Sequence, residues 1–272
     1  MFHGLRKGFL FATLVALLAG FAGAVSAADS PVLDRVVDKQ VLRVGMSGSQ
    51  PPFNVKDRSG ALIGIEVDLA TSIAAGLRVD LEIVEKPFGE LLGELEAGRV
   101  DMVMSGMAIT PERTQKVSFV GPYLMSGKSI LTKSSTLAAA GDAGQINTAD
   151  VTLAALSNST SETFAQRALP EAKLVTVADY DEAVKLLRED KVDAVVADMP
   201  ICRLTIMRYP EAGFATLKEP FTYEPVGIAV SADDPQFLNL IDNFVDAMEA
   251  TGALDGIRAN WLQNSAWIAA LP

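Results

Sequence analysis

The chain has very little of two residue types on which much protein chemistry depends, because its 272 residues include one cysteine and one histidine. Since Cys202 is alone, no disulfide can form within the chain, and we expect it to be a small buried apolar side chain on a helix. His3 lies in the first 27 residues, so the remainder can form neither a Ser-His-Asp nor a Cys-His arrangement, nor a histidine-ligated metal site. We therefore expect no metal, no cofactor and no conventional hydrolase, while carboxylate, lysine and tyrosine chemistry stays open.

Long hydrophobic runs are absent except near the N-terminus. There, two cations precede a mostly apolar stretch over residues 9–21, which is too short to span a bilayer comfortably, and Val25-Ser26-Ala27 fits a signal-peptidase site. We predict a signal peptide over residues 1–27, cleaved before Ala28, and an exported chain. No cysteine follows the apolar stretch, which argues against lipid attachment. A retained membrane anchor is the alternative interpretation.

Basic residues are scarce relative to acidic ones. The chain has 23 Lys and Arg against 34 Asp and Glu, which gives a formal net charge of −11. This acidic balance argues against nucleic acid and anionic membranes as partners. The length allows one large domain or two smaller lobes.

The segment from Asp101 to Arg113 combines several features of an anion site. The apolar run Met102–Met104 predicts a buried strand, and the small polar pair Ser105-Gly106 follows it. Thr110-Pro111-Glu112 is typical of a helix start, since Thr is a good N-cap and Pro is favoured at the first helical position. Exposed amides, a helix N-terminus and the guanidinium of Arg113 together suit a carboxylate. The alternative is an ordinary strand-to-helix turn with a solvated arginine.

One pattern occurs twice in the chain. Residues 88–101 and residues 180–193 each begin with an aromatic residue, continue as an amphipathic helix and a turn, and end on an aspartate that opens an apolar strand. When the two segments are placed in register, Gly106 corresponds to Asp198. The repeat predicts two lobes that are built alike. Chance similarity between two helix-turn-strand units is the alternative.

Apolar patterning predicts alternating strands and helices along the chain. The expected strands are Val41–Met46, Val79–Val84, Met102–Met104, Thr152–Ala155, Lys173–Val177, Ala194–Ala197 and Val226–Val230. The expected helices are Glu66–Ala75, Gly89–Ala97, Ser161–Ala168, Tyr180–Glu189, Pro200–Arg208 and Pro235–Thr251. This alternation predicts an α/β fold whose ligand binds beyond the carboxyl ends of the strands. The Ala- and Gly-rich segment Leu137–Asn147 is expected to be a loose surface loop.

Several short motifs, taken in their order along the chain, resemble one family. They are Arg43–Phe53, Gly64–Leu69, Gly98–Asp101, Ser105–Arg113, Gly121–Tyr123, Ser159–Glu162, Lys191–Asp193 with Asp198, and Gly252–Leu254 before Trp261. Each motif alone is weak, but their order and spacing are specific. From about Leu42 to Trp261, the chain resembles the periplasmic polar-amino-acid-binding proteins of ABC transporters, which are solute-binding proteins of family 3 with the type II periplasmic binding fold.

The resemblance implies an α/β fold of two lobes, each a mixed sheet flanked by helices, joined by two hinge crossings near Pro122–Ser129 and Pro220–Gly227. Lobe 1 is expected to comprise residues 28–125 and 225–272, and lobe 2 residues 126–224. The resemblance further implies a monomeric periplasmic receptor that captures a small carboxylate, most readily an amino acid, between its lobes. The expected partner is an inner-membrane ABC permease. Closure over the ligand would be a hinge motion.

The same resemblance implies roles for single residues. Arg113 resembles the clamp for the ligand carboxylate, and Ser105 with the backbone at Met107 and Ala108 resembles its partners in lobe 1. Ser159 and Thr160, at a helix start in lobe 2, would add amide donors for the same carboxylate.

For the rest of the ligand, Asp198 resembles the residue that accepts the α-ammonium group, and Phe88 resembles the aromatic that packs on the aliphatic part. An arginine and an acid from different lobes make physical sense, because burying both ends of a zwitterion is costly unless each charge finds a partner. Helix capping is the alternative role for Asp198, and core packing is the alternative role for Phe88.

Some positions depart from the family pattern. Ser47 stands where binders of basic amino acids carry an acid, and Gln50 stands where many members have an aromatic residue. These departures disfavour lysine, arginine and ornithine, and they favour a ligand with a neutral or polar side chain. A carboxylate without an α-amino group stays open. Four methionines are expected near the cleft, either as an adaptable apolar wall or as plain core: Met104, Met107, Met125 and Met199.

Two other functions stay open from the sequence. One is a periplasmic enzyme on the same fold, similar to cyclohexadienyl dehydratase, in which Asp198 would act as a general acid. The lack of histidine, and of a second acid at the cleft positions identified in lobe 1, argues against it. The other is a sensory module that presents its ligand to a membrane receptor, which the sequence does not separate from transport.

Overall fold

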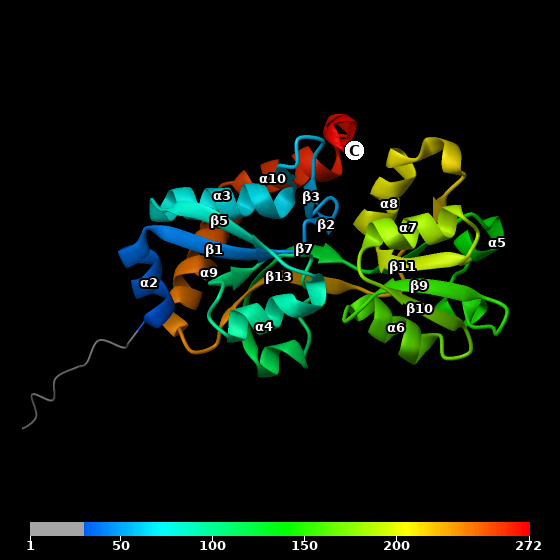
Figure 1. Ribbon diagram of the computed structural model, residues 1–272, viewed down its shortest axis with the longest axis horizontal. Helices are drawn as coiled ribbons and strands as arrows, with labels where there is room; N and C mark the ends of the chain where they lie inside the picture. Colours follow the sequence, from blue (N-terminus) through cyan, green and yellow to red (C-terminus); the bar gives the residue numbers. More distant parts are fainter. Residues whose placement is uncertain (1–29) are drawn as a thin grey trace, which may run out of the picture.

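The computed structural model describes residues 30–272. The predicted signal peptide, residues 1–27, and its cleavage before Ala28 lie outside this range. Figure 1 shows two lobes side by side, and the blue N-terminal and orange-to-red C-terminal elements share one lobe, while the other is built from the green-to-yellow middle of the chain. Within residues 30–272, no helix has the length and apolar composition needed to cross a membrane.

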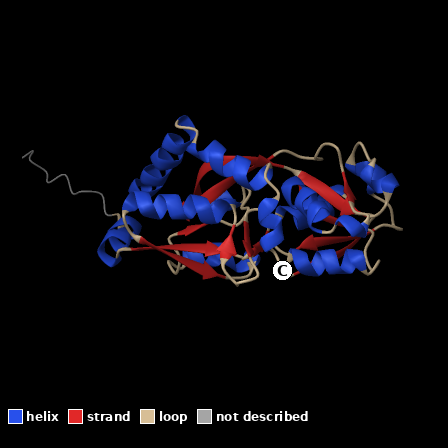
Figure 2. Cartoon of the chain, turned by 90° about the horizontal axis from the view of Figure 1, so that it is seen from above, coloured by secondary structure: helices blue, strands red, loops and turns tan. Residues whose placement is uncertain are grey.

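A five-stranded mixed sheet forms the centre of lobe 1, in the order β5-β1-β6-β13-β7. β1 runs parallel to β5 and β6, whereas β13 runs antiparallel to β6 and β7. The strands are β1 (Val41–Met46), β5 (Asp80–Glu85), β6 (Met102–Val103), β7 (Val117–Ser126) and β13 (Glu224–Ser231). The helices are α2 (Pro31–Lys39), α3 (Ile65–Leu77), α4 (Leu91–Glu96), α9 (Pro235–Ala250) and α10 (Ala253–Leu262), and they cover both faces of the sheet (Figures 1 and 2).

One buried carboxylate fixes two of these helices. Asp234 accepts the N–H of Phe237 at 2.8 Å, which caps α9. It also accepts the Ser30 hydroxyl at 2.7 Å and the N–H of Val32 at 2.8 Å, at the start of α2. Because helix N-termini leave N–H groups without intrahelical partners, a single acid here ties the first described helix to a helix near the C-terminus.

A second five-stranded sheet forms the centre of lobe 2, in the order β10-β9-β11-β8-β12. β9 runs parallel to β10 and β11, and β8 is antiparallel to β11 and β12. The strands are β8 (Lys128–Thr132), β9 (Thr152–Leu156), β10 (Lys173–Val177), β11 (Ala194–Asp198) and β12 (Ala215–Thr216). The helices are α5 (Ser135–Ala138), α6 (Thr160–Ala168), α7 (Tyr180–Arg188) and α8 (Met199–Arg208).

The repeated sequence pattern corresponds to a repeated structural unit. Asp101, before β6, accepts the N–H of Arg43 at 2.7 Å and returns its own N–H to the Arg43 carbonyl at 2.9 Å. Asp193, before β11, makes the same two bonds with Thr152, at 2.7 and 2.8 Å. In each lobe the aspartate therefore joins the start of a central strand to its parallel neighbour.

The two hinge crossings lie against each other. β7 pairs with β13 as far as Ser126, and β8 begins at Lys128, so Gly127 is the single residue between the sheets. A Cβ atom on Gly127 would lie 1.8 Å from the carbonyl oxygen of Thr222, so only glycine permits this close approach. We propose the lobe limits that the resemblance implies, so that lobe 1 ends at residue 125 and resumes at residue 225, and lobe 2 comprises residues 126–224.

A small antiparallel sheet, which the sequence analysis did not anticipate, lies at the edge of lobe 1 that faces lobe 2. Its strands are β2 (Ser49–Gln50), β3 (Asn54–Lys56) and β4 (Leu62–Ile63). β2 contacts α7 of lobe 2. These strands are two or three residues long, too short for a readable alternation of apolar and polar residues.

Two local expectations are wrong. The segment Leu137–Asn147 is not a loose loop, because α5 runs into it and a 3₁₀ turn over Ala143–Ile146 buries Ile146 in lobe 2. The helix expected after Pro111 is a single 3₁₀ turn over Arg113–Gln115, since the chain enters β7 directly afterwards. Arg113 therefore does not sit at the start of a helix with an appreciable dipole.

Candidate functional site

Arg113 presents a positive charge that the protein leaves largely unpaired. Its Nη1 donates to the Ala108 carbonyl oxygen at 2.8 Å, and its Cζ lies 5.6 Å from the centroid of the Phe88 ring. Among residues 30–272 this guanidinium forms no ion pair. Burial lowers the pKa of Arg113, and the negative charge of Glu224 opposes that change. Since arginine stays protonated in proteins, Arg113 offers a fixed charge with free N–H donors.

A cavity of about 590 Å³ opens between the two lobes beside Arg113. Lobe 1 lines it with Thr110–Arg113, lobe 2 with the start of α6, and the second hinge crossing with Glu224. Of the site residues predicted from the sequence, Arg113, Ser159 and Thr160 line this cavity, and the others do not.

The start of α6 supplies the lobe 2 side of the cavity. The Ser159 hydroxyl accepts the N–H groups of Ser161 at 3.1 Å and Glu162 at 3.2 Å, so it caps the helix. The Thr160 hydroxyl instead donates to Oε2 of Glu224 at 2.8 Å. The Ser159 hydroxyl is thus occupied by the backbone, and that of Thr160 links the helix to the hinge.

Asp198 does not line the cavity, but Lys128 joins it to Glu224, which does. Lys128 Nζ lies 3.0 Å from Oδ1 of Asp198 and 3.1 Å from Oε2 of Glu224, and its side chain is 2% exposed. Lys128 and Asp198 are cross-strand partners in β8 and β11. Oδ1 of Asp198 also accepts the Ser126 hydroxyl at 2.9 Å. The site therefore contains a buried acid–lysine–acid chain.

Lys128 and Glu224 were not predicted from the sequence. Both lie inside the predicted hinge crossings, to which no side-chain role was assigned. A signal for Lys128 was present, because it heads the buried strand segment Ser129–Thr132, and a lysine that is buried needs an anionic partner. Glu224 carried no comparable signal.

Ser105 and Ser47 are occupied with each other. The Ser105 hydroxyl donates to the Ser47 hydroxyl at 3.0 Å and accepts the Ser47 N–H at 3.1 Å. The Ser47 hydroxyl also donates to Oδ1 of Asn54 at 3.3 Å. Since Ser105 is fully buried, its side chain shapes the loop instead of lining the cavity.

Glu66 lies beneath the same loop, and the sequence analysis gave it no role. Its carboxylate accepts the Gly106 N–H at 2.7 Å, the Asn54 amide at 2.6 Å and the Tyr123 hydroxyl. Burial raises the pKa of Glu66 to about 7, although these three hydrogen bonds act to lower it. A titratable group thus supports the loop that leads to Arg113.

Phe88 and Gln50 are both buried in lobe 1. Phe88 is 7% exposed and lies under the Arg113 guanidinium. Gln50 is 3% exposed. A Cβ atom on Gly106 would lie 2.8 Å from its Oε1, so Gln50 lies against the binding loop.

Met107 and Ala108 anchor this loop to the hinge. The Met107 carbonyl accepts the Gly227 N–H at 3.0 Å, and Ala108 forms an isolated bridge with Val226. The N–H groups of Met107 and Ala108 have no hydrogen-bond partner in the described part of the chain. Two backbone donors therefore remain available next to Arg113.

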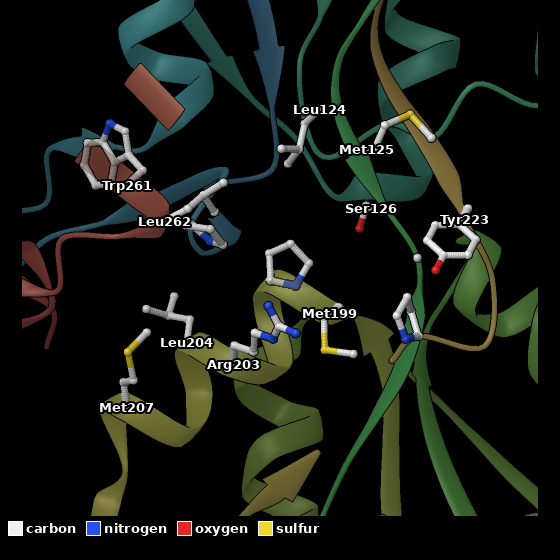
Figure 3. Close-up of a pocket in the computed structure, with 14 residues that line it drawn as sticks. Leu124, Met125, Ser126, Met199, Arg203, Leu204, Met207, Tyr223, Trp261 and Leu262 are labelled. Atoms are coloured by element: carbon white, nitrogen blue, oxygen red, sulfur yellow. The ribbon is translucent and has the colours of Figure 1, made fainter. Parts of the chain in front are cut away.

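The predicted methionine cluster does not form. Met104 and Met107 belong to the core of lobe 1, whereas Met125 and Met199 line a second cavity, of about 320 Å³, between α10 and α8 (Figure 3). Met125 is 56% exposed there, because β7 turns this side chain away from both cores. None of the predicted site residues lines the second cavity.

The lobes touch across the cleft. A Cβ atom on Gly89 of lobe 1 would lie 2.6 Å from Nδ2 of Asn158 in lobe 2, so this contact depends on glycine. Glu112 and Arg167 are also from opposite lobes, and Oε1 of Glu112 lies 3.9 Å from Nη1 of Arg167. Together with the contact between β2 and α7, these contacts describe a closed arrangement.

Comparison with known proteins places this geometry in context. The chain is 28% identical over 249 residues to a cyclohexadienyl dehydratase of Pseudomonas aeruginosa, covering 92% of each protein. It is 28% identical over 251 residues to the ABC transporter arginine-binding protein 1 of Escherichia coli, covering 91% of this chain and 97% of that protein. Among solved structures, the ancestral amino acid-binding protein AncCDT-1, a precursor of cyclohexadienyl dehydratase, superposes with a TM-score of 0.78 at 34% identity, over 85% of this chain and 99% of that one.

Several of the similar proteins are named as amino-acid-binding proteins, one of them of an ABC transporter, and at least one is named as an enzyme. The two-lobed fold expected from the resemblance is confirmed by the structural neighbours. The family of bacterial extracellular solute-binding proteins, family 3, matches residues 42–264. With two mixed sheets, two hinge crossings and an interlobe cavity that holds an unpaired arginine, the chain belongs to the bacterial extracellular solute-binding proteins of family 3.

Proposed function

We propose that this protein is exported to the periplasm by its N-terminal signal peptide and, as a monomer, captures a small carboxylate and delivers it to an ABC permease. A neutral or polar amino acid is the ligand that the site favours. The observation that carries the proposal is the Arg113 guanidinium, which is partly buried at an interlobe cavity and forms no direct ion pair within residues 30–272, although Glu224, Asp198 and Glu112 act on it from a distance. Its guanidinium keeps N–H donors that no protein acid contacts, and a carboxylate matches their geometry, so a ligand carboxylate is its natural partner.

The two ends of the ligand would meet different lobes. Arg113 and the free N–H groups of Met107 and Ala108 would hold the carboxylate. Glu224, which lines the cavity, and Asp198 behind it would face the ammonium group. Since the ligand would then bridge lobe 1, the hinge and lobe 2, its binding would stabilise the closed form.

The direct test is mass spectrometry of small molecules released from freshly purified protein. A thermal-shift screen of amino and organic acids should then reproduce a saturable stabilisation by the released compound. Absence of any released ligand, together with no shift across the screen, would contradict the proposal.

A second candidate is dehydratase activity, and two observations favour it. One matched protein is a cyclohexadienyl dehydratase, and the cavity contains an acid, Glu224, that the sequence analysis did not identify. In such an enzyme a cleft carboxyl would act as a general acid. Incubation with prephenate or arogenate decides between the two functions, because an aromatic product that forms in proportion to protein concentration would replace the receptor proposal.

A further inference from the structure

The acid–lysine–acid chain has a charge that can be counted. Asp198 and Glu224 are negative and Lys128 is positive, so the three together carry one net negative charge. Arg113 adds one positive charge at the same cavity. Arg113 and Glu224 line the cavity, and Lys128 and Asp198 lie behind Glu224, so these four groups sum to zero before any ligand enters. Glu112 and Arg167, which also line the cavity and face each other, cancel.

We propose that Lys128 is a resident cation that sets the net charge of the ligand, so that the site accepts net-neutral zwitterions and rejects basic amino acids. The inference rests on the proposed function, because it assumes that the ligand lies between Arg113 and the acids. In this arrangement the Lys128 ammonium already neutralises one of the two acidic charges, so only one acidic charge is left for the ligand's α-ammonium group and none for a side-chain cation.

Lys128 cannot leave this position without breaking two buried ion pairs. Its side chain is 2% exposed and contacts two carboxylates. Its backbone is fixed on both sides, because its N–H donates to the Thr222 hydroxyl at 2.9 Å and its carbonyl accepts the Phe221 N–H at 2.7 Å. Breaking a buried ion pair leaves charges without partners, which is strongly unfavourable.

The charges around the cavity also limit the net charge of a ligand. A basic ligand would bring a side-chain cation in addition to its α-ammonium group, and this excess positive charge would face Lys128 and Arg113 with no acid left to pair with it. The Ser47 position in lobe 1 holds a hydroxyl that is already bonded to Ser105 and Asn54, so it provides no replacement acid. A net-neutral zwitterion instead leaves the closed site with zero net charge, and each ligand charge meets an opposite one.

The test is a charge series at two positions. Lys128→Met keeps an unbranched side chain that is one atom shorter and makes the site one unit more negative, whereas Glu224→Gln keeps the shape of the side chain and makes the site one unit more positive. The double variant returns the net charge to zero. Isothermal titration calorimetry with L-glutamine, L-arginine and L-glutamate then compares ligands of similar length that differ in charge.

We expect the wild-type protein to prefer glutamine. The ratio of arginine to glutamine affinity should rise about tenfold or more in Lys128→Met, and the ratio of glutamate to glutamine affinity should rise by a similar factor in Glu224→Gln. The double variant should prefer glutamine again. If Lys128→Met does not fold, as judged by circular dichroism, Glu224→Gln carries the test in the opposite direction.

The outcomes separate this inference from the proposed function. Wild-type protein that binds none of the three amino acids would overturn this inference, whereas the proposed function is decided separately by the released ligand and the thermal-shift screen. Wild-type protein that binds glutamine, with single variants that keep the same order of preference, would overturn this inference alone. Wild-type protein that binds arginine more tightly than glutamine would also overturn this inference alone.

Discussion

Glu66 Oε1 accepts the backbone N–H of Gly106 at 2.7 Å, and this bond connects a buried carboxyl group to the loop that precedes Arg113. Burial raises the pKa of Glu66 from 4.5 to about 7. The folded protein therefore holds this proton more tightly than the unfolded chain does. The stability that protonated Glu66 contributes is fully present below pH 4.5 and is lost as the pH rises to about 7.

The difference between these two pKa values corresponds to about 3 kcal/mol. We expect the melting temperature of wild-type protein to fall between pH 4.5 and 8, relative to Glu66→Gln, by roughly 5–10 °C. Differential scanning calorimetry of both proteins across this range measures the effect, and the subtraction removes the contribution of other titrating groups. Parallel curves for the two proteins would show that Glu66 titrates normally.

Arg113 should account for most of the carboxylate affinity. Arg113→Ala removes the free guanidinium, so we expect ligand affinity to fall about a hundredfold or more. Arg113→Lys keeps the charge but loses the bidentate geometry, so its ligand affinity should lie between those of the wild-type protein and Arg113→Ala. Arg99→Ala is the matched control, because Arg99 is 60% exposed and pairs with Glu94 on α4. Full affinity in Arg113→Ala, measured by calorimetry, would exclude it as the clamp.

The contact between Gly89 and Asn158 predicts a variant that opposes closure. A methyl group on Gly89 would meet Asn158 Nδ2 at 2.6 Å, so Gly89→Ala should weaken ligand binding about tenfold while it leaves the melting temperature of the free protein nearly unchanged. Asn158 has a φ of 59°, a conformation that glycine adopts readily. Asn158→Gly in the same protein should therefore restore binding, and a double variant that stays weak would locate the defect elsewhere.

The two aspartates of the repeated unit should differ in their effect on stability. Asp101 is 2% exposed and forms ion pairs with Arg35 and Arg43, whereas Asp193 is exposed. Removing one partner of a buried ion pair costs about 3–5 kcal/mol, so Asp101→Ala should be strongly destabilising. Asp193→Ala loses only a hydrogen bond to the backbone and should cost about 1 kcal/mol. Urea unfolding of both variants measures the difference, and equal losses would contradict it.

The longer helices and strands were predictable because half-buried elements place apolar residues at regular intervals in the sequence. β1 and β10 have the predicted limits, and α7 and α9 end one residue earlier than expected. β2 to β4 were missed because they are too short to show a period. β7 was missed because Gly121 and Pro122 interrupt its apolar pattern, although its hinge role was expected.

The candidate site was only partly predictable. Arg113 and Thr160 do lie together, because each belongs to a motif whose local geometry is set by nearby residues. Lys128 and Glu224 lie 96 positions apart, and their meeting depends on the pairing of the two crossings. Such long-range contacts leave no local pattern, so the balance of charge at the cavity became apparent only from the structure.

The ladder between β7 and β13 limits how the halves of this protein can move. Two strands that share hydrogen bonds from Val117 to Ser126 cannot slide past each other without breaking several bonds at once. Bending and twisting of the pair break none. The strand pair therefore acts as a flexure: it permits rotation of one half relative to the other and resists translation.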